Sequence, residues 1–502
     1  MNGKISRLIA VSFLVFLNSC YWNEPPPKDT IVFAIGSEPK TLDPRYATDA
    51  GGQRIGHLIF SSLIKRNKKL ETVGNLASSW SYKDLVYTFE LKPGIYFHNG
   101  DPATSRDFVY SIEQYQKNSS PFSAQFKVIT KADANYDVKT GGTLKIYLET
   151  FASSFITNLP LLKLLQEKFT EKMGENFYKN PMGTGPMKFA NMDIKNIHLE
   201  RNDQYFGEAA KSKKLQFKVI KDSNTRFQKM YKGQIDIVQS EVPFSKVQFF
   251  KRQNNFSVVV EKGLSTTYLL LNLKHEELSK SQVRHAISSA INREEIIKYT
   301  HEGYAEKATS IITKANPYHD HTLKYKTLTK DEVKSIFSEM NEKPIILKTS
   351  NTQEAVENGR VLAHQLKSLG LNVEQQSYEW GTYYEDVRTG KFDMAVMKWV
   401  GISDPDIYRT SLHSEMTPPG RNRGYYNNKI LDKLVDKAFI EPDEEIRKQL
   451  YLHAQKVVFH DLPTIPLWYE KQVAIIHKRV KNYTLPMSGD YSALLDVYKE
   501  NE

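Results

Sequence analysis

The sequence predicts a mixed α/β protein with more than one lobe. Runs of alternating apolar and polar residues, which are typical of strands, are interspersed with runs whose apolar residues recur at helical spacing. The 502 residues allow about two to four domains at roughly 100–200 residues per domain. Apolar residues make up 40% of the chain and charged residues 25%, an ordinary balance for globular proteins. This composition excludes a disordered chain and a fibrous repeat.

The N-terminal segment has the pattern of a secretory signal. A short basic region precedes an apolar run at residues 8–17, and Cys20 follows a small residue. This ending resembles the lipobox of bacterial lipoproteins, which implies removal of residues 1–19 and lipidation of Cys20. A plain signal peptide with an incidental cysteine is the alternative. Residues 20–30 contain three consecutive prolines and are interpreted as an extended tether that holds a soluble body at a membrane.

Composition also limits the partners. Cys20 is the only cysteine, so the chain has neither an intramolecular disulfide framework nor a zinc ribbon. The formal net charge is +11, but basic residues are spread along the chain with acids between them. Because no Arg-rich tract, RNP-like motif or C₂H₂ spacing occurs, nucleic acid is not an expected partner. The positive charge favours an anionic membrane surface or acidic ligands.

The first clear elements form a small antiparallel unit. Residues 87–91 alternate between apolar and polar side chains, and a Pro-Gly turn then leads into residues 95–97. Thr104 and Asp107 have capping-box spacing, which predicts a helix that runs through Tyr115.

Helices and strands then alternate in the second half of the chain. Residues at helical spacing predict one buried helix face made of Val283, Ala286, Ile287, Ala290 and Ile291. Asn292 and Glu295 have the spacing of an N-cap for the next helix. Residues 361–369 form another helical stripe that Gly370 ends, and Leu371 and Val373 begin a strand after it. A second apolar run follows at residues 392–400, after Gly390. This segment is therefore interpreted as an α/β lobe.

The patterns of several catalytic classes are missing. The sequence contains no GxSxG, HExxH, GxxxxGK[ST] or GxGxxG motif, and the single cysteine lies at the expected lipid site. We therefore expect no enzymatic activity, no cofactor and no metal ion. His319, Asp320 and His321 form the one compact cluster of groups able to bind metal. We interpret it as a solvated polar loop, with a weak metal site as the alternative.

Six motifs occur in order behind the signal segment. They are SEPKTLDP at 37–44, LASSW at 76–80, LKPG with FHNG at 91–100, NPMGTGP at 180–186, VRHA with AINR at 283–293, and DPD with GY at 404–425. Each motif alone is weak, but together they resemble the oligopeptide and dipeptide solute-binding proteins of bacterial ABC importers, extracellular solute-binding protein family 5. The resemblance covers the chain from about residue 31 to residue 499.

The resemblance implies a two-lobed fold of the periplasmic-binding-protein type II. In this fold two α/β lobes close on the ligand about a hinge, and here an extra domain would be inserted in the first lobe. The first lobe would comprise residues 31–75, 184–263 and 465–502. The inserted domain would cover residues 76–183, and the second lobe residues 264–464.

The same resemblance implies a transport function. It indicates a monomeric, exported lipoprotein, anchored to a bacterial membrane and facing the periplasm or the cell exterior. This protein would capture oligopeptides between its lobes and deliver them to a permease driven by an ATPase. One alternative keeps the importer role for another cargo, such as a murein peptide, nickel complex, haem, opine or sugar. The other is a structural or chaperone-like lipoprotein outside transport.

The resemblance also implies where the ligand binds. Candidate ligand-binding residues in the second lobe are Trp399, Gly401, Asp404, Asp406, Arg421, Arg423 and Tyr425. Ser37 and Glu38 are the candidates from the first lobe, and Phe122 is the candidate from the inserted domain.

Most candidates also have a structural interpretation that the sequence leaves open. Trp399 and Phe122 are then core residues, and the two aspartates are turn and helix-cap residues beside Pro405. The two arginines are solvated loop residues, and the first-lobe pair belongs to a turn.

One position departs from the family pattern. Members that hold the α-ammonium of a peptide often place an aspartate three residues after the cleft tryptophan, and here that place is Ile402. A buried ammonium needs a counter-charge. The missing acid therefore motivates the hypothesis of a cargo without a free amine.

Overall fold

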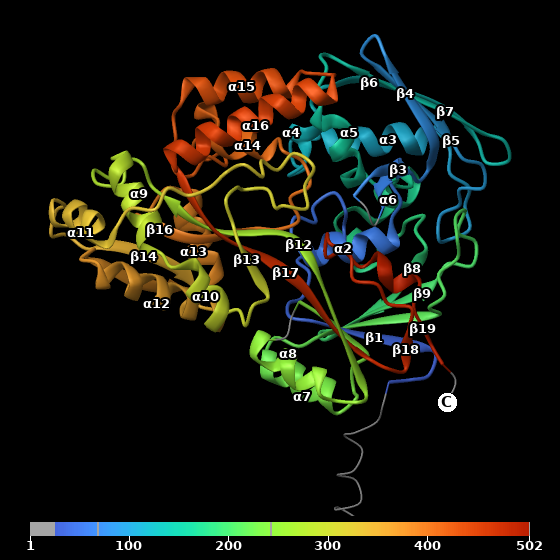
Figure 1. The fold of residues 1–502 in the computed structure, drawn as a ribbon. Coiled ribbons are helices and arrows are strands. Elements are labelled where there is room, and N and C mark those ends of the chain that lie inside the picture. The colour runs from blue at the N-terminus through green and yellow to red at the C-terminus, as the bar shows by residue number, and fades with distance from the viewer. Residues whose placement is uncertain (1–25, 68–69, 241–242, 501–502) are drawn as a thin grey trace, which may run out of the picture.

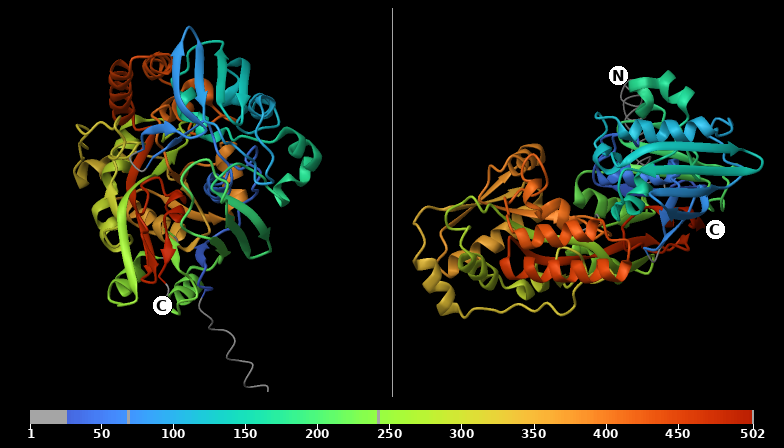
Figure 2. Two further views of the ribbon diagram at one scale, coloured as in Figure 1. Left: turned by 90° about the vertical axis from the view of Figure 1, so that its right-hand side faces the viewer. Right: turned by 90° about the horizontal axis from the view of Figure 1, so that it is seen from above.

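The computed structural model describes residues 26–67, 70–240 and 243–500. Two bodies lie side by side, and one large sheet runs through both (Figure 1; Figure 2). We call the body that holds the first strand lobe I, and the other lobe II. Helices and strands alternate in both, which confirms the predicted mixed α/β class. No helix in the described part of the chain combines the length and the hydrophobicity needed to cross a bilayer.

The large sheet is shared between the lobes. Lobe I contributes β1 (Thr30–Ile35), β8 (Met187–Met192), β9 (Asn196–Arg201), β10 (Lys214–Val219) and β11 (Ile237–Gln239). Lobe II contributes β13 (Ala305–Lys307), β14 (Ile345–Ser350), β15 (Val373–Tyr378) and β16 (Met394–Trp399). The longer strands β12 (Phe256–Leu271) and β17 (Thr464–His477) belong to both lobes. The strand order is β15-β14-β16-β12-β17-β11-β1-β10-β9-β8, and β13 also pairs with β17.

The chain enters lobe II through β12 and returns through β17. These antiparallel strands pair from Phe256 opposite His477 to Leu270 opposite Thr464. Strand β17 also pairs with β11 of lobe I, whereas β12 pairs with β16 of lobe II. The register between β12 and β17 shifts between Glu261 and Ser265. This irregularity gives the crossing a point where two lobes can bend relative to each other.

A second sheet caps lobe I at the top of Figure 1, and we call the stretch that carries it, residues 77–158, the capping segment. It is antiparallel, in the order β4-β5-β7-β6, and is built from β4 (Ala77–Lys83), β5 (Val86–Leu91), β7 (Gly141–Leu148) and β6 (Ile129–Asp137). The helix α3 (Ser105–Gln116) begins with the expected capping box. The backbone N–H of Thr104 donates to the Asp107 carboxylate at 2.8 Å, and the Thr104 hydroxyl accepts from the Asp107 N–H. That prediction is confirmed.

The remaining elements fill the space around the two sheets. Lobe I and the capping segment also contain β2 (Ile64–Arg66), β3 (Thr72–Gly74), β18 (Val480–Lys481), β19 (Tyr498–Lys499), α2 (Ala50–Ile59), α4 (Ser123–Phe126), α5 (Ser154–Asn158), α6 (Glu167–Met173), α7 (Ser223–Tyr231), α8 (Phe244–Lys251) and the short 3₁₀ helices η2 (Leu159–Leu161), η3 (Gly174–Lys179) and η5 (Ser492–Leu495). Lobe II also contains α9 (Ser281–Ala290), α10 (Arg293–Tyr299), α11 (Lys330–Ser338), α12 (Gln353–Ser368), α13 (Trp380–Arg388), α14 (Ile407–Leu412), α15 (Lys429–Phe439), α16 (Glu444–Asp461) and η4 (Ser414–Met416).

Each lobe has its own hydrophobic core. In lobe I one continuous cluster of buried side chains runs from Phe33 on β1 to Phe89 on β5, so the capping segment shares the core of this lobe. In lobe II one cluster lies under α9 and α12, and another joins α14, α15 and α16. Because the cores are separate, each lobe keeps its internal packing when the crossing strands bend. The segment boundaries expected from the resemblance remain predictions.

Local predictions in lobe II agree with the structure. The expected helix face is buried on α9, and the side chain of Asn292 accepts the N–H of Glu295 at the start of α10. Gly370 has a φ of +100° directly after α12, which explains why the helix stops there. Residues 95–97 differ from the expectation of a strand. Their one ladder contact is an isolated bridge between Tyr96 and Pro102.

A buried ion cluster ties the C-terminal segment to lobe I. The carboxylate of Asp236 is fully buried and accepts the backbone N–H of Val32 on β1 at 2.7 Å. It also pairs with Arg479 at 2.6 Å and with Lys499 at 3.0 Å. The side chain of Asp236 therefore connects three segments. They are β1, the start of β11, which directly follows Asp236, and the C-terminal segment.

Candidate functional site

Polar side chains gather where β12 and β17 cross between the lobes. At the end of β11, the Gln239 amide donates to the carbonyl oxygen of Gly489 at 2.9 Å and accepts from the Tyr483 hydroxyl at 2.5 Å. The next residue, Ser240, donates to the Gln472 side chain on β17 at 2.5 Å. These contacts hold the loop around Gly489 against the crossing strands on the lobe I side.

A charged group continues this polar surface on the lobe II side. The carboxylate of Glu470 on β17 pairs with Lys398 on β16 and accepts the Thr267 hydroxyl of β12 at 2.8 Å. These interactions, with the Lys398 charge the largest of them, outweigh burial and lower the pKa of Glu470. The ion pair therefore stays charged at neutral pH and links three neighbouring strands at the junction.

Strand β16 ends at this junction with two of the predicted site residues. Trp399 is half-buried and stacks on Tyr268, with ring centroids 5.8 Å apart and planes 9° apart. Gly401 has a φ of +68°. A β-carbon at this position would have one neighbour within 4 Å among the described residues, the carbonyl oxygen of Ser488 at 3.9 Å. The residues after β16 therefore lie within van der Waals reach of the loop that contains Gly489.

Ile402 follows these two residues and is held by its backbone. Its N–H donates to the carbonyl oxygen of Leu264 on β12 at 3.1 Å. The half-buried side chain packs against the cluster that joins α14 to α16. This apolar environment offers no counter-charge for an ammonium group at position 402.

The two predicted aspartates are engaged within lobe II. Asp404 accepts the backbone N–H of Asp406 at 2.8 Å and pairs with Arg447 on α16 at 3.0 Å, so it is a turn residue in an ion pair. The charge of Asp404 also acts on Arg66 of β2, whose pKa is lowered by burial. The charge of Asp404 in lobe II is therefore felt at β2 of lobe I.

Asp406 is buried beneath this turn. Its carboxylate accepts the Tyr451 hydroxyl at 3.3 Å, and it makes no side-chain cap bond to α14. Burial and the neighbouring Asp404 raise the pKa of Asp406 to about 7. Asp406 occupies the N-cap position of α14, as the helix-cap interpretation expects, but its carboxylate accepts from Tyr451 on α16 instead of capping the helix.

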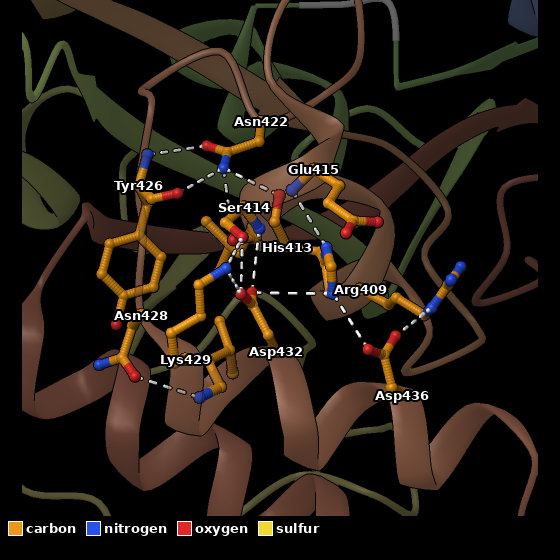
Figure 3. A network of polar contacts seen from close by, with 12 residues as sticks. Arg409, His413, Ser414, Glu415, Asn422, Tyr426, Asn428, Lys429, Asp432 and Asp436 are labelled. Carbon is orange, nitrogen blue, oxygen red and sulfur yellow. Dashed lines mark hydrogen bonds and ion pairs between the residues drawn. The ribbon is translucent and has the colours of Figure 1, made fainter.

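A network of hydrogen bonds positions the loop that carries the other predicted residues (Figure 3). The side-chain amide of Asn422, which is buried, donates to the carbonyl oxygens of His413 and Tyr426 and accepts the Tyr426 N–H at 3.0 Å. Asp432 on α15 accepts the N–H of Ser414 at 2.9 Å and also its hydroxyl. The loop is thereby anchored to the start of α15.

The three predicted site residues in this loop lie in different environments. Arg421 is exposed. Arg423 is buried, at 8% exposure, and donates to the Tyr384 hydroxyl at 3.0 Å, so its interpretation as a solvated loop residue is wrong. Tyr425 has a φ of +59°, and the ammonium of Lys274 lies 3.8 Å from its ring centroid.

The candidates outside lobe II also fall in different environments. Ser37 and Glu38 are exposed directly after β1. Phe122 is buried in the capping segment, where its ring lies 6.1 Å from that of Tyr115. This contact agrees with the interpretation of Phe122 as a core residue.

The cluster His319-Asp320-His321 differs from the expected solvated loop. His319 and Asp320 are both buried at 4% exposure, and only His321 is exposed. One ring nitrogen of His319 pairs with the carbonyl oxygen of Ile312 at 3.0 Å, and burial lowers the His319 pKa to about 4. Within the described residues, no group of three or more His, Cys, Asp or Glu side chains is arranged to hold a metal ion.

Sequence reasoning missed a group of basic residues on lobe I. Arg54 and His57 lie one turn apart on α2, and Lys163 pairs with Ser62 in an isolated bridge beyond the end of that helix. The charge of Lys163, then burial, lowers the pKa of His57 well below its usual range. No motif signals this group, because its members come from separate segments of the chain.

The two bodies also touch away from the crossing strands. The backbone N–H of Ser153 donates to the carbonyl oxygen of Phe439 on α15 at 2.8 Å, and its hydroxyl donates to that of Ala438. Phe439 packs against the core of lobe I. The capping segment and lobe II therefore meet across the junction, opposite β12 and β17.

Comparisons with known proteins agree with this architecture. The model for the middle region of bacterial extracellular solute-binding proteins, family 5, matches residues 71–417. The oligopeptide-binding protein AppA of Bacillus subtilis is 26% identical over 492 residues, covering 91% of this chain and 88% of that protein. The probable D,D-dipeptide-binding periplasmic protein DdpA of Escherichia coli is 25% identical over 476 residues, covering 91% of this chain and 92% of that protein.

Solved structures have the same fold. The periplasmic binding protein DppA from Helicobacter pylori, in complex with the peptide STSA, superposes with a TM-score of 0.83 at 25% identity, covering 94% of this chain and 98% of that one. NikZ from Campylobacter jejuni, in complex with Ni(L-His), superposes with a TM-score of 0.82 at 22% identity, covering 94% and 100%. These likenesses confirm the predicted two-lobed fold.

Proposed function

Since this chain belongs to family 5 of the bacterial extracellular solute-binding proteins, we propose that it captures peptides between its lobes and delivers them to the permease of an ABC importer. The match over residues 71–417 is the observation that carries the proposal. Support for peptide as the cargo comes from the oligopeptide-binding AppA and from the peptide complex of the Helicobacter pylori protein.

The geometry of the junction supplies a physical route to capture. Bending at the register shift between β12 and β17 brings the end of β16 toward the loop around Gly489. Backbone groups at these strand ends pair with the backbone of an extended peptide, as in strand addition. Ordered water fills the space around variable side chains, so one cleft accepts different sequences.

The proposal includes location and partners. We infer an exported protein, anchored through a lipid at Cys20, that acts as a monomer with the permease and ATPase of its importer. Cys20 lies outside the described residues. Membership of a solute-binding family supports a binding role rather than catalysis. Loss of membrane association in Cys20→Ala, measured by cell fractionation, is the expected result for the anchor.

The lobe boundaries given above belong to the same proposal, as do the predicted ligand contacts. Among those contacts, Trp399 and Gly401 have the best support, because both lie at the end of β16, next to the loop around Gly489. Asp404 and Asp406 have less support as ligand contacts. The carboxylate of Asp404 pairs with Arg447, and that of Asp406 accepts the Tyr451 hydroxyl.

Native mass spectrometry of the full chain, purified gently in detergent, tests the proposal. Closed binding proteins retain cargo, so we expect a ladder of mass additions in the range of short peptides. A single discrete addition of a non-peptide or metal-containing compound would instead favour another cargo. The control is the same protein after unfolding and refolding, which should have no additions and should regain them from a mixture of di- to hexapeptides.

A further inference from the structure

The basic group on lobe I has a defined geometry. Arg54 and His57 are three residues apart on α2 and so lie on one face of that helix. The chain leaves α2 and pairs with the segment around Lys163, where the N–H of Leu164 donates to the carbonyl oxygen of Ser61 at 2.9 Å.

The Lys163 side chain lies between the core of lobe I and α2. Leu162, Leu164 and Leu165 are all buried in that core, and Lys163 is buried beside them at 6% exposure. The bridge to Ser62 places Lys163 beside the end of α2, and its charge is the main influence on His57. His57 itself is exposed, so the group is open on the side opposite the core.

These three basic side chains are not neutralised by a bonded acid in the part of the chain that the structure describes. Among the described residues, none of their side-chain nitrogens takes part in a hydrogen bond or an ion pair that joins it to an acid. Arg54 lies over the ring of Tyr491, with its guanidinium carbon 5.6 Å from the ring centroid. The acid that acts on His57 is Asp490, and its carboxylate already accepts the Ser492 N–H at 2.8 Å as well as the hydroxyls of Ser488 and Ser492.

An ammonium in this position is costly for the folded protein. Lys163 is 6% exposed, and burial lowers its pKa to about 7. A buried charge without a counter-charge destabilises a fold, and an apolar residue of similar volume would avoid this cost. A purely structural role therefore does not explain a lysine here, whereas an anion from outside the chain would.

The basic group also borders the junction between the lobes. A β-carbon on Gly489 would lie 3.1 Å from the Arg54 guanidinium nitrogen Nη2. The preceding residue, Ser488, lies opposite Gly401 at the end of β16. A single short loop thus separates the basic group from the strand end where Trp399 and Gly401 lie.

We propose that Arg54, His57 and Lys163 form a subsite on lobe I that binds a carboxylate of the captured peptide. The inference rests on the proposed function and names the charged group of the cargo. The guanidinium and the ammonium supply charge-assisted hydrogen bonds, and the neutral imidazole donates one more. The carboxylate has two sources, the C-terminus of the peptide and the side chain of an acidic residue.

Three tripeptides separate these sources. Trialanine carries a C-terminal carboxylate, trialanine amide carries none, and Ala-Glu-Ala amide carries only the side-chain carboxylate. Isothermal titration calorimetry with the full chain in detergent, after release of cargo is verified by native mass spectrometry, gives the three dissociation constants. We expect the amide to bind at least about tenfold more weakly than one of the two carboxylates.

The variants locate the effect on the proposed subsite. In Lys163→Met the preferred carboxylate should lose at least about tenfold in affinity, while trialanine amide changes less than about twofold. Arg54→Gln should act in the same direction, and it keeps the experiment decisive if the lysine variant does not fold. Lys139→Met, at an exposed position in the turn between β6 and β7, is the matched control and should bind like the wild type.

Three results would overturn the inference. If the wild type binds all three peptides equally, peptide capture stands but no carboxylate subsite exists. The same conclusion follows if both variants keep the wild-type preference for the carboxylate. If the wild type binds none of the peptides, the failure lies in the proposed peptide cargo, and the carboxylate subsite falls with it.

Discussion

Gly263 on β12 packs directly against the carbonyl oxygen of Glu470 on β17, at the irregular point of the crossing between the lobes. A β-carbon at position 263 would collide with that backbone oxygen. The register between the strands shifts at the same place, between Glu261 and Ser265. The irregular pairing of the crossing strands therefore depends on a residue without a side chain.

Gly263→Ala should destabilise the protein. The new methyl group must push the two crossing strands apart, which costs about 1–3 kcal/mol. Thermal unfolding followed by circular dichroism measures the change. Gly56→Ala on α2 is the matched control, because a β-carbon there meets no described atom within 4 Å. Its stability should be equal to that of the wild type or slightly higher, and an equal loss in both variants would contradict this account of Gly263.

Asp236→Asn should cost about 3 kcal/mol of folding free energy. The substitution leaves the guanidinium of Arg479 and the ammonium of Lys499 without their buried counter-charge. Denaturant unfolding measures the loss. Asp203→Asn removes an exposed carboxylate that also pairs with an arginine, Arg201, and should cost less than about 1 kcal/mol. Equal effects would mean that burial does not set the value of the Asp236 cluster.

Lys163→Met should stabilise the ligand-free protein below pH 7. Burial lowers the Lys163 pKa from 10.5 to about 7, so protonation of this group favours the unfolded chain. The penalty is fully present below pH 7 and disappears as pH rises from 7 toward 10.5. The variant should therefore gain about 3–5 kcal/mol in acid and neutral solution and little near pH 10.

Chemical denaturation at a series of pH values measures this difference. The neighbouring charged groups Arg54, His57 and Asp490 are present in both proteins. Removal of the Lys163 charge also raises the pKa of His57 toward its ordinary value of 6.5, so the comparison above pH 7 isolates the lysine, and the gain in acid includes the relief of His57. A variant that is less stable than the wild type at pH 6 would show that Lys163 has a structural role. Greater stability together with weaker peptide binding is the result expected of a ligand-binding residue.

Ile402→Asp should increase the preference for peptides with a free amine. The new carboxylate would lie beside Gly401 at the end of β16, where a peptide ammonium would gain a counter-charge. Trialanine should then bind about fivefold more tightly relative to N-acetyl-trialanine than it does in the wild type. Fluorescence titration measures both affinities.

The control for this substitution is Ile402→Asn, which introduces a polar group without the charge. It shares the cost of removing the half-buried isoleucine from its contacts with the α14–α16 cluster. If the aspartate variant gains nothing over the asparagine variant, the cargo does not place an amine at this position. The hypothesis of a cargo without a free amine would then regain support.

Local structure was predictable where the deciding residues are close in sequence. The capping box of Thr104 and Asp107 and the N-cap of Asn292 are each satisfied within three residues, and both occur as expected. The helix stop at Gly370 depends on one backbone conformation that glycine adopts readily. These features rest on short-range sterics and hydrogen bonds, so the sequence alone carries the information.

The environment of single side chains was less predictable. Asp406 and Arg423 are buried, although their neighbours in the sequence are polar or belong to turns. His319 and Asp320 are buried as well, in a segment that was expected to be solvated. In each case burial comes from elements distant in sequence that pack over the loop, as α16 does over Asp406.

The sequence by itself determined the mixed α/β class, the local helices and strands, and through six ordered motifs the family. The tertiary structure alone decided which side chains meet at the junction of the lobes. Lys163 is brought to His57 by pairing with the chain that leaves α2, and Gly489 is brought to Arg54 from the far end of the sequence. Charge and burial act through space, so the cost of an unpaired lysine becomes visible only when the chain is folded.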